Sequence, residues 1–232
     1  AVAGTPLEPG WAYLSSGTWS LVGLETKEPV LGARAAEANV TNEAGVYGTN
    51  RLLKNVMGLW ILESCRRAWS ARGRVLTHDE LQRALAGRAP LAQRLDVDDA
   101  RFLNPPDMPA ALAAYLRATG QAPLTSELEL SQLVLESLAR RTAEVLALLA
   151  ELTATPPRGL HIVGGGSQND FLNQRTADAT GLPVRAGPVE ATALGNLAVQ
   201  AITDGVFSDL AEARLAIARS VTPREFRPDR PS

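Results

Sequence analysis

The chain has 232 residues, which is enough to bury a full hydrophobic core in one large domain or two small ones. Its apolar fraction of 45%, charged fraction of 21% and net charge of −2 give no general attraction to nucleic acid or to an anionic membrane. Cys65 is the only cysteine, which excludes an internal disulfide bond and a cysteine-built metal site. Because we find no pattern of a signal peptide or membrane span, we expect a soluble, cytoplasmic protein.

The first part of the chain predicts a β-hairpin followed by a helix. Two strand-like runs, residues 11–14 and 19–24, flank a turn at residues 15–17 in which Ser and Gly favour chain reversal. A further strand is expected near residues 44–47. Apolar residues at helical spacing then predict a helix over residues 52–69.

Residues 71–124 are punctuated by Gly and Pro, and we interpret them as a helical insertion. Thr77 and Glu80 have the spacing of a capping box, which predicts that a helix starts there. Consecutive prolines predict a loop over residues 102–109, and a short helix is expected over residues 110–118.

The remainder of the chain alternates helix and strand. We expect a long amphipathic helix after Thr125 or Ser126, strands at residues 161–163 and 183–186, and helices at residues 169–180, 190–203 and 210–218. Strands that alternate with helices pair in parallel, whereas a hairpin is antiparallel. The sequence therefore predicts an α/β fold with a mixed sheet flanked by helices.

Three consecutive glycines, Gly164, Gly165 and Gly166, follow the buried strand and precede a helix. Glycine lets the backbone approach a ligand closely, and a helix start offers N–H donors and a positive dipole end to an anion such as phosphate. The turn is not a dinucleotide-binding fingerprint, because Asn169 replaces the last glycine, and it lacks the residues of a P-loop or nucleophile elbow. The alternative is a tight turn that needs glycine for geometry alone.

The hairpin turn at Ser16, Gly17 and Thr18 is a second candidate for phosphate binding. Its backbone N–H groups and the Thr18 hydroxyl could cradle an anion, although by itself it is an ordinary hairpin turn. Paired with the glycine turn, it predicts two loops that close on one nucleotide.

Other polar and reactive residues give weaker signals. His78 and His161 are far apart and lack partners at ligand spacing, so no metal site built by the protein is predicted. Cys65 is interpreted as a packing residue. From spacing alone, Asn55 is a surface residue.

An ordered set of segments resembles the FGGY carbohydrate kinases, relatives of glycerol kinase. The segments are residues 15–21, 41–43, 51–60, 102–105, 161–169 and 186–196. The resemblance implies an actin-like ATPase (ribonuclease H-like) fold with a core over about residues 11–226. It further implies that residues 1–232 are a single C-terminal lobe, which would partner an N-terminal lobe absent from this chain.

The resemblance also implies roles for individual residues. Carried over position by position, it places ATP against Gly17, Thr18, Gly164, Gly165, Gly166 and Asn169. Asn55 would face the sugar. A nucleotide contact that is usually Gln in the family falls on Glu63, whose carboxylate cannot donate the hydrogen bonds of an amide and would repel phosphate.

The implied activity belongs to a longer enzyme. That enzyme would use ATP and Mg²⁺ and would be most similar to kinases that convert L-rhamnulose to L-rhamnulose 1-phosphate. Its catalytic Asp would lie just before Ala1, so this chain alone is expected to be inactive. The alternatives are another ketose kinase such as fuculokinase, a nucleotide-binding module without kinase activity, and a purely structural domain.

Overall fold

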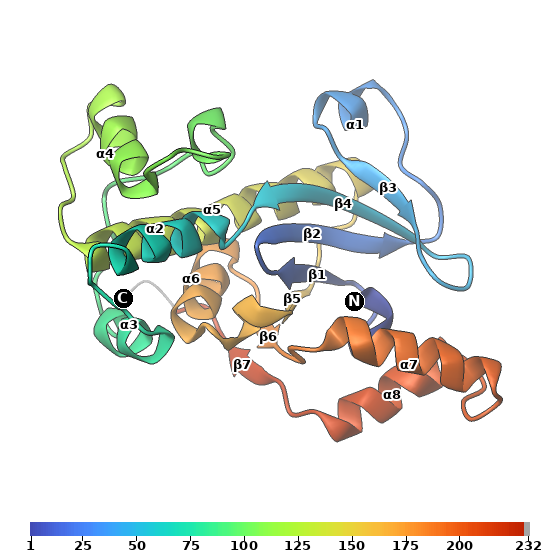
Figure 1. Ribbon diagram of the computed structural model, residues 1–232. Coiled ribbons are helices and arrows are strands. Elements are labelled where there is room, and N and C mark those ends of the chain that lie inside the picture. Colours follow the sequence, from blue (N-terminus) through green and yellow to red (C-terminus); the bar gives the residue numbers. More distant parts are fainter. Residues whose placement is uncertain (230–232) are drawn as a thin grey trace.

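A seven-stranded mixed sheet forms the centre of the computed structural model, which describes residues 1–229 (Figure 1). The strand order is β3-β4-β2-β1-β5-β6-β7. The strands are β1 (Trp11–Ser16), β2 (Trp19–Thr26), β3 (Thr41–Ala44), β4 (Asn50–Met57), β5 (Gly159–Val163), β6 (Val184–Ala186) and β7 (Arg224–Phe226). β5 pairs in parallel with β1 and β6, and the other pairs are antiparallel, which confirms the predicted mixed sheet.

Helices cover both faces of the sheet and one of its ends. The α-helices are α1 (Ala33–Glu37), α2 (Trp60–Ser70), α3 (His78–Leu85), α4 (Met108–Ala118), α5 (Glu127–Thr153), α6 (Asp170–Thr180), α7 (Ala191–Thr203) and α8 (Leu210–Ser220). Three short 3-10 helices are η1 (Val2–Gly4), η2 (Ala100–Phe102) and η3 (Gly165–Gln168). In Figure 1, α5 and α6 lie on one face, α7 and α8 lie together near the N-terminus, and α2, α3 and α4 gather at one end.

The main core lies between the sheet and α5. Leu14, Val22 and Leu52 belong to it and are at most 2% exposed. On the opposite face Tyr13 and Leu53 form a smaller cluster with the N-terminal segment. Alternating side chains therefore serve two cores, as expected for a sheet with helices on both faces.

The predicted helix over residues 52–69 is wrong for its first part. Residues 50–57 form β4, and the helix begins only at Trp60. Leu52 and Leu53 are both fully buried, one in each core. A strand buried on both faces gives a short continuous apolar run, which periodicity cannot distinguish from a helix.

Two smaller boundaries also differ from expectation. The strand expected near residues 44–47 is β3, which ends at Ala44, and Tyr47 lies in a turn with φ +54°. The loop expected over residues 102–109 is shortened by α4. Asp107 caps that helix by accepting the N–H of Ala110, and proline is tolerated in a first helical turn.

The remaining predicted elements are confirmed. Thr77 and Glu80 form the capping box of α3, and Ser126 caps α5 in the same way. Gly181 ends α6 with φ +68°. The sequence did not predict β7, a three-residue antiparallel edge strand.

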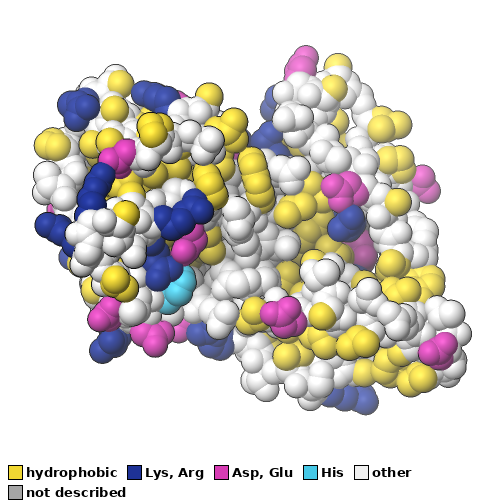
Figure 2. All heavy atoms as spheres, viewed as in Figure 1, with side chains coloured by type: hydrophobic (Ala, Val, Ile, Leu, Met, Phe, Trp, Pro, Cys, Tyr) yellow, Lys and Arg dark blue, Asp and Glu magenta, His cyan; other side chains and the backbone are white. Residues whose placement is uncertain are grey.

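The N-terminal segment packs against α7. A Cβ on Gly4 would lie 2.0 Å from the Ala191 carbonyl oxygen, so η1 touches the helix backbone directly. Hydrophobic side chains remain exposed over α7 and α8 (Figure 2), among them Leu197 at 61% and Leu215 at 58%. In residues 1–229 no helix has the length and apolar character needed to cross a membrane.

Candidate nucleotide-binding site

The two predicted turns lie against each other at the ends of neighbouring parallel strands. Ser16 ends β1, and Gly164 follows β5. A Cβ on Gly166 would lie 1.9 Å from Ser16 Oγ, and a Cβ on Gly164 would lie 2.7 Å from the Ser16 carbonyl oxygen. Gly164 also has φ +84°. Packing and backbone conformation therefore account for these two glycines without any ligand.

Gly165 has no such internal reason to be glycine. It is exposed, and no protein atom lies within 4 Å of the position that its Cβ would take. Its φ is not in the positive region. The open space beside Gly165 would let a ligand reach the backbone, and a side chain would fill it.

The start of α6 is less open to an anion than the sequence predicts. A 3-10 helix, η3, separates the strand from α6. Asn169 caps α6 by accepting the Leu172 N–H at 2.9 Å, and the Asp170 N–H donates to Gln82 Oε1 at 2.8 Å. Any backbone donors for an anion would therefore come from the first residues of η3, which have no partner within their own helix.

The hairpin turn is fastened to the start of α2. The N–H groups of Leu59 and Trp60 donate to the carbonyl oxygens of Gly17 and Thr18 at 2.9 and 3.2 Å. Thr18 is exposed, and among the described residues its hydroxyl has no hydrogen-bond partner. Its side chain is therefore free to contact a ligand.

Asn55 lies on β4 and not at a helix start. It is exposed, and its Cα pairs with Leu21 of β2, which in turn pairs with Ser15 of β1. Ser15 pairs with Val163, the residue before the glycine turn. Residues in such a row share one face of a sheet. Asn55 therefore lies two strands from β1, in the same cross-strand row as Val163, which directly precedes the glycine turn.

Glu63 lies on α2 and carries a paired charge. Arg66 Nη1 donates to both carboxylate oxygens, at 2.9 and 3.1 Å. Arg66 was not predicted as a site residue, although its spacing of three residues from Glu63 is that of a helical ion pair.

The remaining candidates are structural. Cys65 is fully buried, and burial raises the pKa of its thiol to about 12, which agrees with a packing role. His161 is 1% exposed, and its Nε2 lies 2.5 Å from the Gly187 carbonyl oxygen. Burial lowers the pKa of this imidazole.

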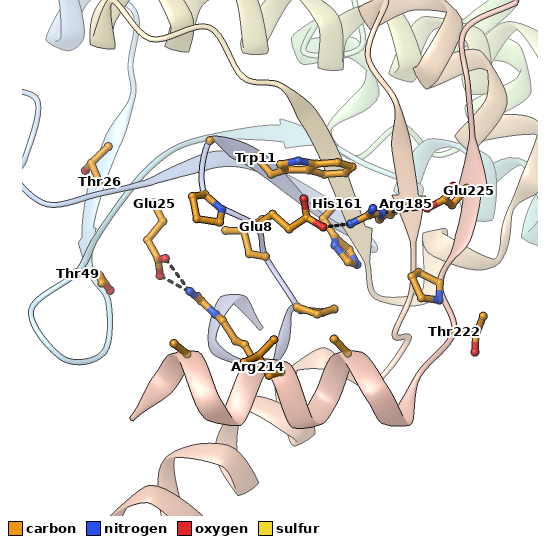
Figure 3. A pocket seen from close by; sticks show the side chains of 18 of the residues that line it. Glu8, Trp11, Glu25, Thr26, Thr49, His161, Arg185, Arg214, Thr222 and Glu225 are labelled. Atoms are coloured by element: carbon orange, nitrogen blue, oxygen red, sulfur yellow. Dashed lines mark hydrogen bonds and ion pairs between the residues drawn. The ribbon is translucent and has the colours of Figure 1, made fainter. Parts of the chain in front are cut away.

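A cavity of about 1000 Å³ lies away from the two turns, between the sheet and α8 (Figure 3). Trp11, at the opposite end of β1 from Ser16, lines it together with Arg185 and Arg214. Arg214 pairs with Glu25 at 2.9 Å, and Arg185 pairs with Glu8 and Glu225. These carboxylates neutralise both guanidinium groups, so the pairs fasten the surrounding elements together.

Residues 1–229 contain no group of three or more His, Cys, Asp or Glu side chains placed to hold a metal ion. A Mg²⁺ ion that enters with a nucleotide is held mainly by phosphate oxygens and water, with one or two carboxylates, and needs no such group.

Comparison with solved structures defines the fold first. A xylulose kinase from Rhodospirillum rubrum matches 98% of this chain with a TM-score of 0.67 and 18% identity, over 44% of its own length. A glycerol kinase from Plasmodium falciparum, solved with ADP, matches 98% with a TM-score of 0.65 and 14% identity, over 44% of its length. The chain therefore has the α/β fold of one part of these sugar kinases.

Sequence comparison then defines the family. A model of the FGGY family of carbohydrate kinases, C-terminal domain, matches residues 12–203, and the chain belongs to this family. Rhamnulokinases from Bacteroides thetaiotaomicron and Bacillus subtilis are 45% and 39% identical to it, over 98% of this chain and 46% of each relative. The chain thus spans about half the length of these relatives, and the resemblance drawn from its motifs is confirmed.

Proposed function

We propose that this chain is the nucleotide-binding C-terminal lobe of an ATP-dependent kinase that converts L-rhamnulose to L-rhamnulose 1-phosphate. The substrate assignment is supported by relatives named rhamnulokinase that are 45% and 39% identical over nearly the whole chain. The single observation that carries the nucleotide assignment is Gly165, whose open surroundings offer backbone to a ligand beside the Ser16 end of β1.

In this proposal the chain binds and orients the nucleotide. The backbone of Gly165 and the hydroxyl of Thr18 approach it from two turns that lie side by side, while Asn55 faces the sugar. ATP supplies the phosphoryl group. Transfer of that group depends on positioning and charge stabilisation, and these turns contribute both.

The base that takes the sugar proton would come from the longer protein that carries this chain. A catalytic Asp is proposed just before Ala1, in the segment joined to η1. Because η1 packs on the backbone of α7, this helix would help to fix that segment. We propose that residues 1–232 form one C-terminal lobe. Its core would span about residues 11–226, and its helical insertion about residues 71–124.

The test is ATP-dependent phosphorylation by the longer protein across a panel of ketoses. We expect L-rhamnulose to give the highest kcat/KM and the 232-residue chain alone to give no turnover with any sugar. Preference for L-fuculose would identify the fuculokinase alternative, and nucleotide binding without any turnover would identify a non-catalytic module. Mg²⁺-dependent turnover by the chain alone would contradict the proposal that the catalytic base lies outside it.

A further inference from the structure

Glu63 lies on the side of α2 that faces the glycine turn. Leu59 Cδ1 is 3.3 Å from the position of a Cβ on Gly166, so this side chain covers the turn. The Glu63 N–H donates to the Leu59 carbonyl oxygen at 2.9 Å, which places Glu63 one helical turn further along the same face. A carboxylate in that position would repel the phosphates of a nucleotide.

Arg66 is held where it neutralises this carboxylate. Its side chain is 19% exposed, against 44% for Glu63, and its Nη1 donates to both oxygens of Glu63. Its Nε and Nη2 both donate to the Leu76 carbonyl oxygen, at 3.0 and 2.9 Å. The guanidinium is therefore locked by the segment that precedes α3 and has little freedom to turn toward a ligand.

His78 completes the cluster. Its Nε2 lies 2.7 Å from Arg66 Nη1 and 3.9 Å from Glu63 Oε1. Because a guanidinium only donates, Nε2 accepts from Arg66. The same helix, α3, reaches the start of α6 through Gln82 and the Asp170 N–H. The cluster thus joins α2 to α3, and α3 in turn contacts the start of α6, the helix that follows η3.

We propose that Arg66 is the counter-ion that lets this site accept a nucleoside polyphosphate although residue 63 is a carboxylate. This inference rests on the proposed function and deepens it. Arg66 is a positioning residue, because it acts on the ligand through Glu63. It follows that Arg66 matters for nucleotide affinity only while residue 63 carries a negative charge.

The test is a double-mutant cycle on ADP affinity, measured by calorimetry in the longer protein that carries this chain. The variants are Arg66→Met, which keeps most of the side-chain stem, Glu63→Gln, and the two combined. We expect Arg66→Met to raise the Kd about tenfold or more at low salt. In the Glu63→Gln background the same change should alter the Kd by less than about threefold.

Salt and a charge-preserving variant separate electrostatics from damage to the fold. Repulsion by an unpaired carboxylate is screened by salt, so the loss caused by Arg66→Met should shrink at high ionic strength. Arg66→Lys keeps the charge and should retain most of the affinity. The matched control is Arg74→Met, which removes an exposed charge paired with Glu127 and should leave the Kd within about twofold.

Three results would overturn the proposal: no loss in Arg66→Met, an equal loss in both backgrounds, or a loss that salt does not reduce. If Arg66→Met does not fold, ADP affinity is compared between Arg66→Lys and the unmodified protein. A large loss of affinity in Arg66→Lys that does not depend on salt would also overturn the proposal. Failure of the unmodified protein to bind ADP would instead refute the proposed function.

Discussion

Ser16 Oγ occupies the space that a Cβ on Gly166 would need, since the two positions are only 1.9 Å apart. The tip of the hairpin and the glycine turn are therefore packed together as one unit. Gly165, between two glycines that the fold itself requires, is the residue of the turn that remains free. The fold therefore explains why residues 164 and 166 are glycine, whereas a role for Gly165 has to be tested by ligand binding.

Replacing Gly166 should destabilise the fold. We expect Gly166→Ala to lower the free energy of unfolding by about 1–3 kcal/mol, because its methyl group overlaps Ser16. Urea unfolding followed by circular dichroism measures the change. Ser16→Gly in the same chain should restore part of the loss, since it removes both overlapping side-chain atoms. If Gly166→Ala and Ser16→Gly instead lower the free energy of unfolding independently and additively, the overlap is not the cause.

The pair between Arg214 and Glu25 should contribute to stability. Both side chains are mostly buried, at 14% and 19% exposure, and two charged hydrogen bonds of 2.9 Å join them. Arg214→Met would leave the carboxylate without a partner, and we expect unfolding to become easier by about 1–3 kcal/mol. Arg34→Met, which breaks an exposed pair with Glu151, is the matched control and should leave the urea midpoint unchanged. Equal effects from the two variants would contradict this account.

His161 should make the fold sensitive to mild acid. Burial lowers its pKa in the folded state below the ordinary value of 6.5. Below that value the imidazole of the unfolded chain binds a proton while the folded one stays neutral, so stability falls as the pH drops. We expect the urea midpoint to decrease from pH 7.5 to pH 5.5, and His161→Gln to flatten this decrease. An equally steep decrease of the urea midpoint in His161→Gln would show that other titrating groups cause the pH dependence.

Cys65 should be unreactive in the native protein. Its thiol is fully buried, and a pKa raised to about 12 leaves almost no thiolate at neutral pH. A thiol reagent such as a disulfide dye should modify it only after denaturant is added. Rapid modification of the native chain would show that the core over α2 opens more readily than the packing indicates.

The sequence predicted the parts of the site that depend on local chemistry. Glycines after a buried strand and a Ser-Gly turn specify chain reversals by themselves, so both turns were found. The strand that carries Asn55 was predicted as a helix, because Leu52 and Leu53 are each buried on a different face of β4. Burial on two faces is a tertiary property that no local pattern reveals.

Contacts between distant segments could not be predicted either. The lock on Arg66 depends on the Leu76 carbonyl oxygen, whose position is set by the loop before α3. The ion pair of Arg214 with Glu25 requires α8 to return to the first hairpin. Such contacts depend on the order of strands in the sheet. The alternation of strands and helices in the sequence limits the possible orders but does not select one.

The most direct test of the central claim is the affinity for ADP of the longer protein with Gly165→Val, compared with the unmodified protein. Because nothing lies within 4 Å of the new Cβ, we expect the melting temperature to stay unchanged. The side chain should fill the space beside the turn and raise the Kd at least about tenfold, or about 1.4 kcal/mol. Unchanged ADP affinity in a normally folded Gly165→Val protein would contradict a nucleotide site at this turn.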